Sequence, residues 1–394
     1  MKLNEEIIVT IVDDNHNGNG IAKVNDFPIF VQRAVKDDIV KIKITTINKK
    51  YAKGIVISYI KRSCDVIKVN CPYYEECGGC ALLHISKEKE NELKKKYISR
   101  LFSNYSISIN CFDRFGYRNK VTLHVKNQKL GFYKEKTNDL IEISKCLLLD
   151  DDINYLIKSL KKIDLSLIKE IVIKKGNDGL LLSIKGKLNN KDMLSLTKLT
   201  KLISIYQNDK LIYGKKYIIN SLNNIKYNIN QNSFFQVNNE CAYALYEQVK
   251  KYVKSCDKLL DLYCGTGSIG IYLSDICKEV VGIEINDDSV RCAKENIVNN
   301  NIKNYKIIKA DASSLKEDNY DVIVVDPPRS GLDKKVISTL NKIKPKKLIY
   351  ISCNPSTLKR DINLLHEYKL LDLKVFNMFP CTGHIECICI LNLR

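Results

Sequence analysis

The stretch DLYCGTGSIG (261–270) decides the fold of the C-terminal half of the chain. It follows the apolar run KLLDL directly and carries glycines in the order G-x-G-x-x-G, at Gly265, Gly267 and Gly270. Glycines so placed permit a tight turn after a strand and let a cofactor approach the backbone at a helix N-terminus. The turn alone fits either a dinucleotide or a methionine-sulfonium cofactor.

Outward from this turn, four more apolar runs alternate with helix-like spacers, near 279–284, 305–309, 321–326 and 347–352. Alternation of this kind predicts a parallel, doubly wound α/β sheet over residues 226–394. Ligands of such sheets bind outside the carboxyl ends of the strands. The residues that follow the predicted strands should therefore meet in one crevice.

Acidic residues mark three of these strand ends. Asp261 precedes the glycine turn, where a carboxylate can meet the amino-acid part of S-adenosylmethionine. Glu284 ends the second strand, where it can take both ribose hydroxyls, and Asp311 ends the third, within reach of the adenine edge. Three such acids favour a methyltransferase over a dehydrogenase or a purely structural turn.

Cys353, in KLIYISCNP (347–355), follows the fifth predicted strand, where a nucleophile would be needed. Uracil C5 attacks a methyl group only after a thiolate has added at C6, and a base must then remove the C5 proton. Glu386 lies in GHIECICIL (383–391), among apolar residues and cysteines that should raise its pKa. A core cysteine and a strand-edge glutamate are the structural alternatives.

The loop DPPRSG (326–331) follows the fourth predicted strand. Methyltransferases that act on exocyclic amines commonly place an aromatic residue after such an Asp-Pro-Pro sequence, to stack on the base. Arg329 stands there in this chain. Carbon methylation of a pyrimidine is therefore favoured over amine methylation.

The segment CPYYEECGGC (71–80) is the strongest metal signal among the 15 cysteines of the chain. Cys71, Cys77 and Cys80 have the spacing C-x5-C-x2-C, and no second C-x2-C pair follows. An iron–sulfur cluster, zinc and no metal at all remain open on spacing alone. Cys146 is the best candidate for a fourth ligand, with rivals at Cys64 and Cys111.

Residues 1–60 contain short alternating stretches separated by turn clusters such as DDNHNGNG (13–20), which predict a small OB-like barrel. Ser86 is the expected N-cap of a helix over 86–102 that could pack on the C-terminal domain. Residues 61–225 otherwise read as an α+β domain. Arg118 and Lys120 form either part of an RNA path or a solvated basic turn.

The 394-residue chain has a formal net charge of +19. An excess of Lys and Arg favours a nucleic-acid partner, although a general bias toward Lys, Ile and Asn would also produce it. The N-terminal sequence MKLNEEIIVT has no apolar signal segment, and no run approaches about 18 apolar residues. We expect a cytoplasmic monomer without a membrane partner.

Together these motifs resemble the RNA 5-methyluridine methyltransferases, which modify uracil C5 in ribosomal and transfer RNA. The resemblance covers essentially the whole chain and implies three parts. Residues 1–60 would be a TRAM domain, an OB-like RNA-binding barrel. Residues 61–225 would be a central α+β domain with a [4Fe-4S] cluster, and 226–394 a Rossmann-like S-adenosylmethionine-dependent methyltransferase domain.

The resemblance also implies roles for single residues. SCNP and HIE match the family's nucleophile loop and base loop, at Cys353 and Glu386. FFQVN (234–238) resembles a cofactor-contacting segment and adds to Gly265 and Asp311 the expected contacts Gln236, Tyr263, Glu284 and Asp326. The implied cluster ligands are Cys71, Cys77, Cys80 and Cys146. Cys381, Gly383 and Ser268 depart from the family's usual residues.

The predicted activity is conversion of uridine to 5-methyluridine through a covalent adduct between Cys353 and C6. Large-subunit ribosomal RNA is the first expected substrate, because transfer-RNA enzymes of the family often lack both the cluster and the TRAM domain. The alternatives are a transfer-RNA 5-methyluridine methyltransferase and a non-catalytic TRAM-type RNA-binding protein. A radical iron–sulfur enzyme is disfavoured, because its usual spacing is C-x3-C-x2-C.

Overall fold

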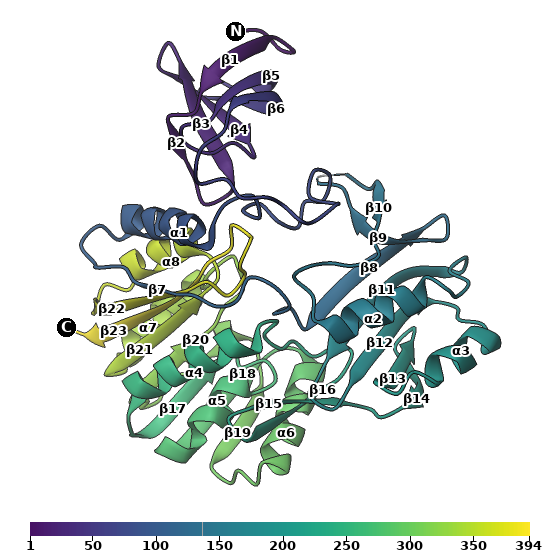
Figure 1. The fold of residues 1–394 in the computed structure, drawn as a ribbon. Coiled ribbons are helices and arrows are strands. Elements are labelled where there is room, and N and C mark those ends of the chain that lie inside the picture. The colour runs from purple at the N-terminus through teal and green to yellow at the C-terminus, as the bar shows by residue number, and fades with distance from the viewer. Residues whose placement is uncertain (136) are drawn as a thin grey trace.

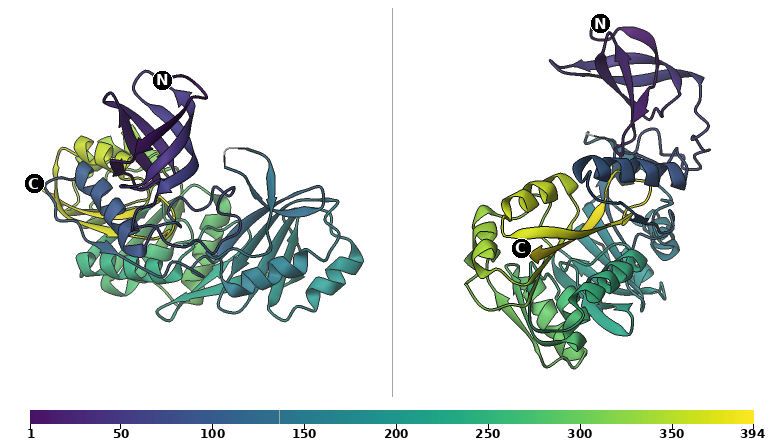
Figure 2. Two further views of the ribbon diagram at one scale, coloured as in Figure 1. Left: turned by 45° about the horizontal axis from the view of Figure 1, so that its top comes forward. Right: turned by 90° about the vertical axis from the view of Figure 1, so that its left-hand side faces the viewer.

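The computed structural model describes residues 1–135 and 137–394 and shows three sheet-based parts (Figure 1). The N-terminal sheet stands apart from the other two and rests on helix α1 (Figure 2). The central and C-terminal sheets lie side by side beneath it (Figure 1). None of the helices in the described residues is both long enough and apolar enough to span a bilayer.

The N-terminal sheet has six strands in the order β1-β5-β6-β4-β3-β2. Buried apolar residues alternate along it, as at Val40, Ile42 and Ile44, so one face forms a small core. Its two edge strands, β1 and β2, are separated by only two residues of the chain. The two edges must therefore lie close together, which means that the sheet is strongly curved. The strands are β1 (Glu6–Thr10), β2 (Asp13–Asp14), β3 (Asn19–Val24), β4 (Phe27–Gln32), β5 (Ile39–Ile47) and β6 (Ala52–Lys61).

Helix α1 (Lys87–Leu101) begins where the sequence predicts, because Ser86 Oγ accepts a hydrogen bond from the Lys89 N–H at 3.1 Å. Its Ile98 and the following Phe102 are buried in the core of the C-terminal sheet. The short strand β7 (Ile109–Asn110) pairs with the edge of that same sheet. Part of the chain before residue 226 therefore packs with the C-terminal sheet.

The central sheet has seven strands in the order β10-β9-β8-β11-β12-β13-β14, and all pairs but β12–β13 are antiparallel. Helices α2 (Asp151–Leu160) and α3 (Asn190–Thr197) contribute to its core. The strands are β8 (Lys120–Lys126), β9 (Lys129–Tyr133), β10 (Leu140–Glu142), β11 (Ile168–Lys175), β12 (Leu180–Gly186), β13 (Leu202–Gln207) and β14 (Lys210–Gly214). A hairpin, β15 (Ile218–Leu222) and β16 (Ile225–Ile229), leads to the C-terminal sheet.

The C-terminal sheet has eight strands in the order β19-β18-β17-β20-β21-β23-β22-β7. Strands β17 to β21 are parallel, as the alternation of apolar runs predicts. The strands are β17 (Cys256–Leu262), β18 (Cys277–Glu284), β19 (Tyr305–Lys309), β20 (Val322–Val325), β21 (Lys347–Ser352), β22 (Tyr368–Phe376) and β23 (Glu386–Leu393). Helices cover both faces, with α4 (Asn239–Val253), α5 (Ser268–Leu273) and α6 (Asp287–Asn299) on one and α1, α7 (Lys334–Ile343) and α8 (Pro355–Leu364) on the other.

The last strand departs from the wholly parallel sheet that the sequence predicts. β23 runs antiparallel and inserts between β21 and β22. The chain between Phe376 and Glu386 is too short to carry a crossover helix, so it must turn back as a hairpin. This return brings the start of β23 beside the end of β21, at the edge where the parallel strands end.

Candidate active site

The glycine turn after β17 is fastened to the end of β18 by Glu284. The Gly265 N–H donates to Glu284 Oε2 at 3.0 Å, and the Asn286 N–H donates to Oε1 at 2.7 Å. Tyr263, between strand and turn, has a φ of 65°, a backbone conformation that residues other than glycine rarely adopt. This strained residue stands at the strand end, where ligands of such sheets bind.

Asp261 is buried beneath the same turn, with 1% of its surface exposed. Its Oδ2 accepts hydrogen bonds from the Gly270 N–H and the Tyr305 hydroxyl, each at 2.9 Å. Its Oδ1 has no hydrogen-bond partner among the described residues. Burial raises the pKa of Asp261 to about 6. An unpaired buried acceptor of this kind suits a donor such as the ammonium group of an amino-acid ligand.

A cavity of about 680 Å³ opens beside the turn and is lined by Tyr263, Glu284 and Asp311. Its volume falls within the range of about 300–1,000 Å³ that small-molecule sites occupy. Hydrogen bonding from the Ser313 side chain, and then from the Ser313 N–H to Asp311 Oδ1 at 2.7 Å, holds the pKa of Asp311 below its ordinary value. The structure therefore brings together three of the predicted cofactor contacts.

The other predicted contacts do not line this cavity. Gly265 is joined to it through Glu284. The backbone oxygen of Gln236 accepts from Asn119 Nδ2 at 2.9 Å, which ties its segment to the central sheet. Asp326 follows β20 and lies in the field of two other carboxylates, Asp261 and Glu386. Cofactor contact at these residues stays a prediction.

Cys353 and Glu386 stand at neighbouring strand ends. In the β21–β23 pair Ser352 lies opposite Cys387, so the next step of the register places Cys353 across from Glu386. Glu386 is buried, with 4% exposed, whereas Cys353 is half-buried. Cys353 opens into a pocket of about 160 Å³ that Arg329 and His384 also line.

Burial and neighbouring charges shift the pKa values of both residues of this pair. Burial, together with the carboxylates of Glu386 and Asp326, raises the pKa of the Cys353 thiol to about 11. Burial and then Asp326 raise the pKa of Glu386 well above its ordinary value, and burial and then Asp261 raise that of Asp326 to about 7. The Arg329 guanidinium opposes these shifts at Cys353 and Glu386. The site thus holds a weakly acidic thiol beside two carboxyl groups whose pKa values are raised, so that either carboxylate is a stronger base than one exposed to solvent.

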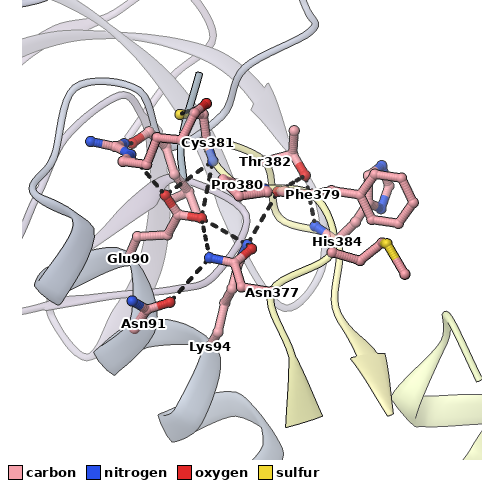
Figure 3. Close-up of polar contacts among 12 residues, drawn as sticks. Glu90, Asn91, Lys94, Asn377, Phe379, Pro380, Cys381, Thr382 and His384 are labelled. Atoms are coloured by element: carbon pink, nitrogen blue, oxygen red, sulfur yellow. Dashed lines mark hydrogen bonds and ion pairs between the residues drawn. The ribbon is translucent and has the colours of Figure 1, made fainter. Parts of the chain in front are cut away.

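The base loop, residues 377–385, is held by a buried carboxylate on α1 (Figure 3). Both carboxylate oxygens of Glu90 accept from the Cys381 N–H at 3.0 Å, and Oε1 also accepts from Asn377 Nδ2 at 2.9 Å. Within the loop, the Thr382 hydroxyl accepts from the His384 N–H at 3.2 Å. The segment that leads into Glu386 is therefore fixed by a helix almost 300 residues earlier in the chain.

Two cations compensate the buried charge of Glu90. Lys94 Nζ donates to Glu90 Oε1 at 2.9 Å and to Asn377 Oδ1 at 2.7 Å, and both Lys94 and Glu90 are fully buried. Arg114 Nε lies 3.3 Å from Glu90 Oε2, and its Nη atoms donate to the backbone oxygens of Leu82 and Ile85, which follow the segment 71–80. The same network thus links the base loop to α1 and to the chain that connects the segment 71–80 to α1.

The four predicted cluster ligands, Cys71, Cys77, Cys80 and Cys146, line one cavity of about 330 Å³. The rivals Cys64 and Cys111 are exposed and lie outside it. Within the described residues no three His, Cys, Asp or Glu side chains converge closely enough to hold a single metal ion. Burial raises the pKa values of the Cys77, Cys80 and Cys146 thiols.

Three residues at the Cys353 pocket were not predicted from the sequence. His16 and Asn17, from the turn between β2 and β3, and Tyr97, from α1, line it together with residues that follow β20 and β21 or precede β23. Their local sequences carry no active-site motif. The sequence feature that could have indicated them was Gly383. A glycine where the family usually has another residue indicates that another part of the backbone lies close to it.

The arrangement agrees with comparisons to known proteins. A family model described as tRNA (Uracil-5-)-methyltransferase matches residues 152–394, more than half of the chain. The chain belongs to the tRNA (uracil-5-)-methyltransferase family. It is therefore an enzyme, an RNA (uracil-5-)-methyltransferase, and the non-catalytic alternative is set aside. A TRAM domain model matches residues 2–57 of the methyltransferase.

Relatives and solved structures match over nearly the full length. An uncharacterized RNA methyltransferase of Staphylococcus epidermidis is 32% identical over 444 residues, covering 98% of this chain and 97% of the relative. One from Staphylococcus aureus gives the same identity and coverage. The crystal structure of the Pyrococcus abyssi tRNA (uracil-54, C5)-methyltransferase with S-adenosyl-L-homocysteine has a TM-score of 0.83 at 25% identity. It covers 98% of this chain and 100% of that one.

Proposed function

We propose that this methyltransferase forms 5-methyluridine in RNA with Cys353 as nucleophile and Glu386 as base. The observation that carries the proposal is the position of these two residues. A half-buried thiol and a buried carboxylate face one another across the register of β21 and β23, at the edge where β17 to β20 also end. This arrangement supplies both groups that carbon methylation of uracil requires.

The thiolate of Cys353 adds to C6 of the target uracil and forms an S–C6 bond, which moves the C5=C6 electron pair onto C5. S-adenosylmethionine, when bound, supplies an electrophilic methyl group that leaves its sulfonium sulfur as C5 attacks it. The carboxylate of Glu386 then takes the proton from C5. The released electron pair restores the C5=C6 double bond, and the S–C6 bond breaks to return the thiolate.

The chain must first convert a neutral thiol into a thiolate. With a pKa of about 11, Cys353 is protonated at neutral pH in the free enzyme. Because Glu386 must stay unprotonated to take the C5 proton later, the thiol proton passes to solvent, which the half-buried Cys353 can reach. The Arg329 guanidinium favours the anionic forms of Cys353 and Glu386. Entry of a flat, neutral base into the pocket brings C6 to the sulfur, where the negative charge can pass to the substrate.

We assign S-adenosylmethionine to the 680 Å³ cavity beside the glycine turn. Asp261 Oδ1 offers a buried acceptor for its ammonium group, and Glu284 lies where the ribose hydroxyls would be. Asp311 lines the adenine end. Gln236, Gly265, Tyr263 and Asp326 complete the proposed set.

The substrate is proposed to be ribosomal RNA of the large subunit, with the four-cysteine cavity as the supporting feature. Transfer RNA is the second candidate, favoured by the Pyrococcus abyssi structure, which aligns with 98% of this chain. That alignment includes the N-terminal sheet. The presence of a TRAM domain therefore does not distinguish an enzyme that acts on ribosomal RNA from one that acts on transfer RNA. We further propose that the sheet forms the family's OB-like barrel and that the enzyme acts as a cytoplasmic monomer.

The cysteine cavity fits a [4Fe-4S] cluster by the chemistry of its donors. Two separate segments bring four thiols to one cavity. Among the described residues no three such side chains are placed to hold one metal ion, whereas a cluster of several iron atoms takes thiolates from three close cysteines and a distant one. We propose Cys71, Cys77, Cys80 and Cys146 as its ligands, in a structural role, because uracil methylation transfers no electron.

Mass-spectrometric mapping of 5-methyluridine in ribosomal and transfer RNA, with and without the gene, tests the proposal. We expect one or more ribosomal uridines to lose the methyl group when the gene is absent and to regain it on complementation. Loss confined to transfer RNA would move the assignment to the second candidate. Unchanged 5-methyluridine in both RNA classes would contradict the proposed activity.

A further inference from the structure

The turn between β2 and β3, residues 15–18, is inserted between two other parts of the molecule. A Cβ atom at Gly18 would lie 2.1 Å from the backbone oxygen of Ala81. A Cβ atom at Gly383 would lie 2.6 Å from Asn17 Oδ1 and 2.8 Å from the His16 backbone oxygen. Real Cβ contacts are never so short, so both glycines are required for this approach. Gly383 therefore has a structural explanation, because it admits the N-terminal turn to the base loop.

Aromatic stacking and ion pairs fix the position of the turn. The His16 ring stacks on Tyr97 of α1 with centroids 3.7 Å apart and planes at 16°. The Tyr97 hydroxyl lies 2.7 Å from Ser356 Oγ, three residues after the nucleophile. Asp13 pairs with Lys96 and Arg100. These contacts make the N-terminal turn part of the wall near Cys353.

The pocket that contains Cys353 is shared between the N-terminal turn and the catalytic strands. His16 and Asn17 line it from one side, and Cys353, Arg329 and His384 line it from the other. Its volume, about 160 Å³, is of the size of a single pyrimidine base rather than of a longer RNA segment. The pocket is therefore incomplete without the N-terminal sheet.

We infer that His16 and Asn17 form the outer wall of the target-base pocket and hold the uracil after it has left its stack. The inference rests on the proposed function. A carboxamide such as that of Asn17 can donate to a uracil carbonyl oxygen and accept from N3–H. Burial lowers the pKa of His16 to about 4, so its ring is neutral and presents a flat surface to a base.

A different role for the N-terminal sheet makes a different prediction. A sheet that only gripped phosphates outside the active site would change RNA affinity and its salt dependence. It would not change the rate of the chemical step once RNA is saturating. A pocket wall, in contrast, changes that rate, because it orients the base against Cys353.

Covalent trapping separates the two roles. Ribosomal and transfer RNA transcripts with 5-fluorouridine in place of uridine are mixed with enzyme and S-adenosylmethionine, and adduct formation is followed at saturating RNA. We expect His16→Ala and Asn17→Ala each to lower the limiting rate about 10-fold or more. Their S-adenosylhomocysteine affinity should match the wild type, and the two proteins are compared well below their melting temperatures because His16→Ala also removes the stack on Tyr97.

His366→Ala and Asn48→Ala are matched controls, since His366 and Asn48 are exposed and lie outside the pocket. Both should retain the wild-type limiting rate. If His16→Ala and Asn17→Ala change only the RNA concentration needed for half-maximal rate, the pocket-wall inference is wrong. Failure of the wild-type enzyme itself to trap either RNA would instead overturn the proposed function.

Alkylation without RNA gives a readout independent of catalysis. Removal of a wall should expose the thiol, so His16→Ala and Asn17→Ala should raise the iodoacetamide reactivity of Cys353, measured by peptide mass spectrometry. The exposed Cys64 provides an internal reference in every sample. Unchanged relative reactivity of Cys353 in both variants would overturn the inference.

Discussion

Glu90 and Cys381 are 291 residues apart in sequence, yet both carboxylate oxygens of Glu90 accept the backbone N–H of Cys381 at 3.0 Å. Cys381 has a φ of 66°, so its peptide is held in a conformation that is unfavourable for a residue with a side chain. The contact lies five residues before the proposed base. Helix α1 thereby sets the path of the loop that delivers Glu386 to the active site.

Glu90→Gln should destabilise the protein by about 3–5 kcal/mol, because it leaves Lys94 and Arg114 buried without their counter-charge. Urea unfolding measures the loss. The double variant Glu90→Gln with Lys94→Met removes one of the stranded cations and should recover part of it. A Glu90→Gln protein as stable as the wild type would contradict the proposed coupling between α1 and the base loop.

Cys353→Ala should abolish methyl transfer and leave S-adenosylhomocysteine affinity nearly unchanged, because the thiol acts on the base and does not line the cofactor cavity. Trapping with 5-fluorouridine RNA and calorimetry measure the two properties. Cys256→Ala is the control, since Cys256 lies at the opposite end of the sheet, where β17 begins. Adduct formation by Cys353→Ala at the wild-type yield would place the nucleophile elsewhere.

Glu386→Gln should slow product release from the adduct by about 10²- to 10⁴-fold, the usual contribution of a general base. The thiol can still add and C5 can still take the methyl group, but the C5 proton stays in place. An RNA–protein adduct with natural uridine should therefore survive on denaturing gels. Turnover at the wild-type rate would assign the base role to another residue, with Asp326 as the next candidate.

Asp326→Asn should move the rise of adduct formation with pH toward lower pH by about one unit. The reaction needs an anionic thiol, so its rate rises with pH, and the charge of Asp326 contributes to the raised pKa values of Cys353 and Glu386. Removal of that charge lowers both pKa values. Asp26→Asn, at a side chain 98% exposed, is the control. A shift toward higher pH would contradict this electrostatic account.

Glu284→Gln should weaken S-adenosylhomocysteine binding about 10-fold or more, because charge-assisted hydrogen bonds contribute about 1.5–3 kcal/mol. The carboxylate also fixes Gly265 and Asn286, so the change loosens the turn around the ligand. Calorimetry measures the affinity. Glu279→Gln, at an exposed position on the same strand, should leave it unchanged.

Anaerobically purified protein should be brown and contain ~4 iron and ~4 sulfide per chain. Cys71→Ala and Cys146→Ala should lose the colour and lower the melting temperature, because ligation is coupled to folding. Cys64→Ala and Cys111→Ala alter exposed cysteines outside the cavity, so these variants should keep the brown colour and the wild-type melting temperature. Stoichiometric zinc without iron in anaerobic preparations would refute the cluster.

The sequence by itself determined the features that depend on neighbouring residues. The apolar runs gave the parallel strands β17 to β21, the glycine turn followed β17, and Ser86 capped α1. Periodicity, capping and turn chemistry act over a few residues, so they can be read from a short stretch of chain. Cys353 and Glu386 could be predicted as candidates for a similar reason, because their residue types are unusual within strand-end patterns.

The tertiary structure alone decided which distant residues meet. The antiparallel insertion of β23 put Glu386 across from Cys353, and docking of the N-terminal sheet put His16 and Asn17 at the same pocket. The pKa values of Asp326 and Glu386 likewise depend on burial and on each other's charge. Such contacts join segments hundreds of residues apart, and their energies arise from packing and desolvation that no local pattern encodes.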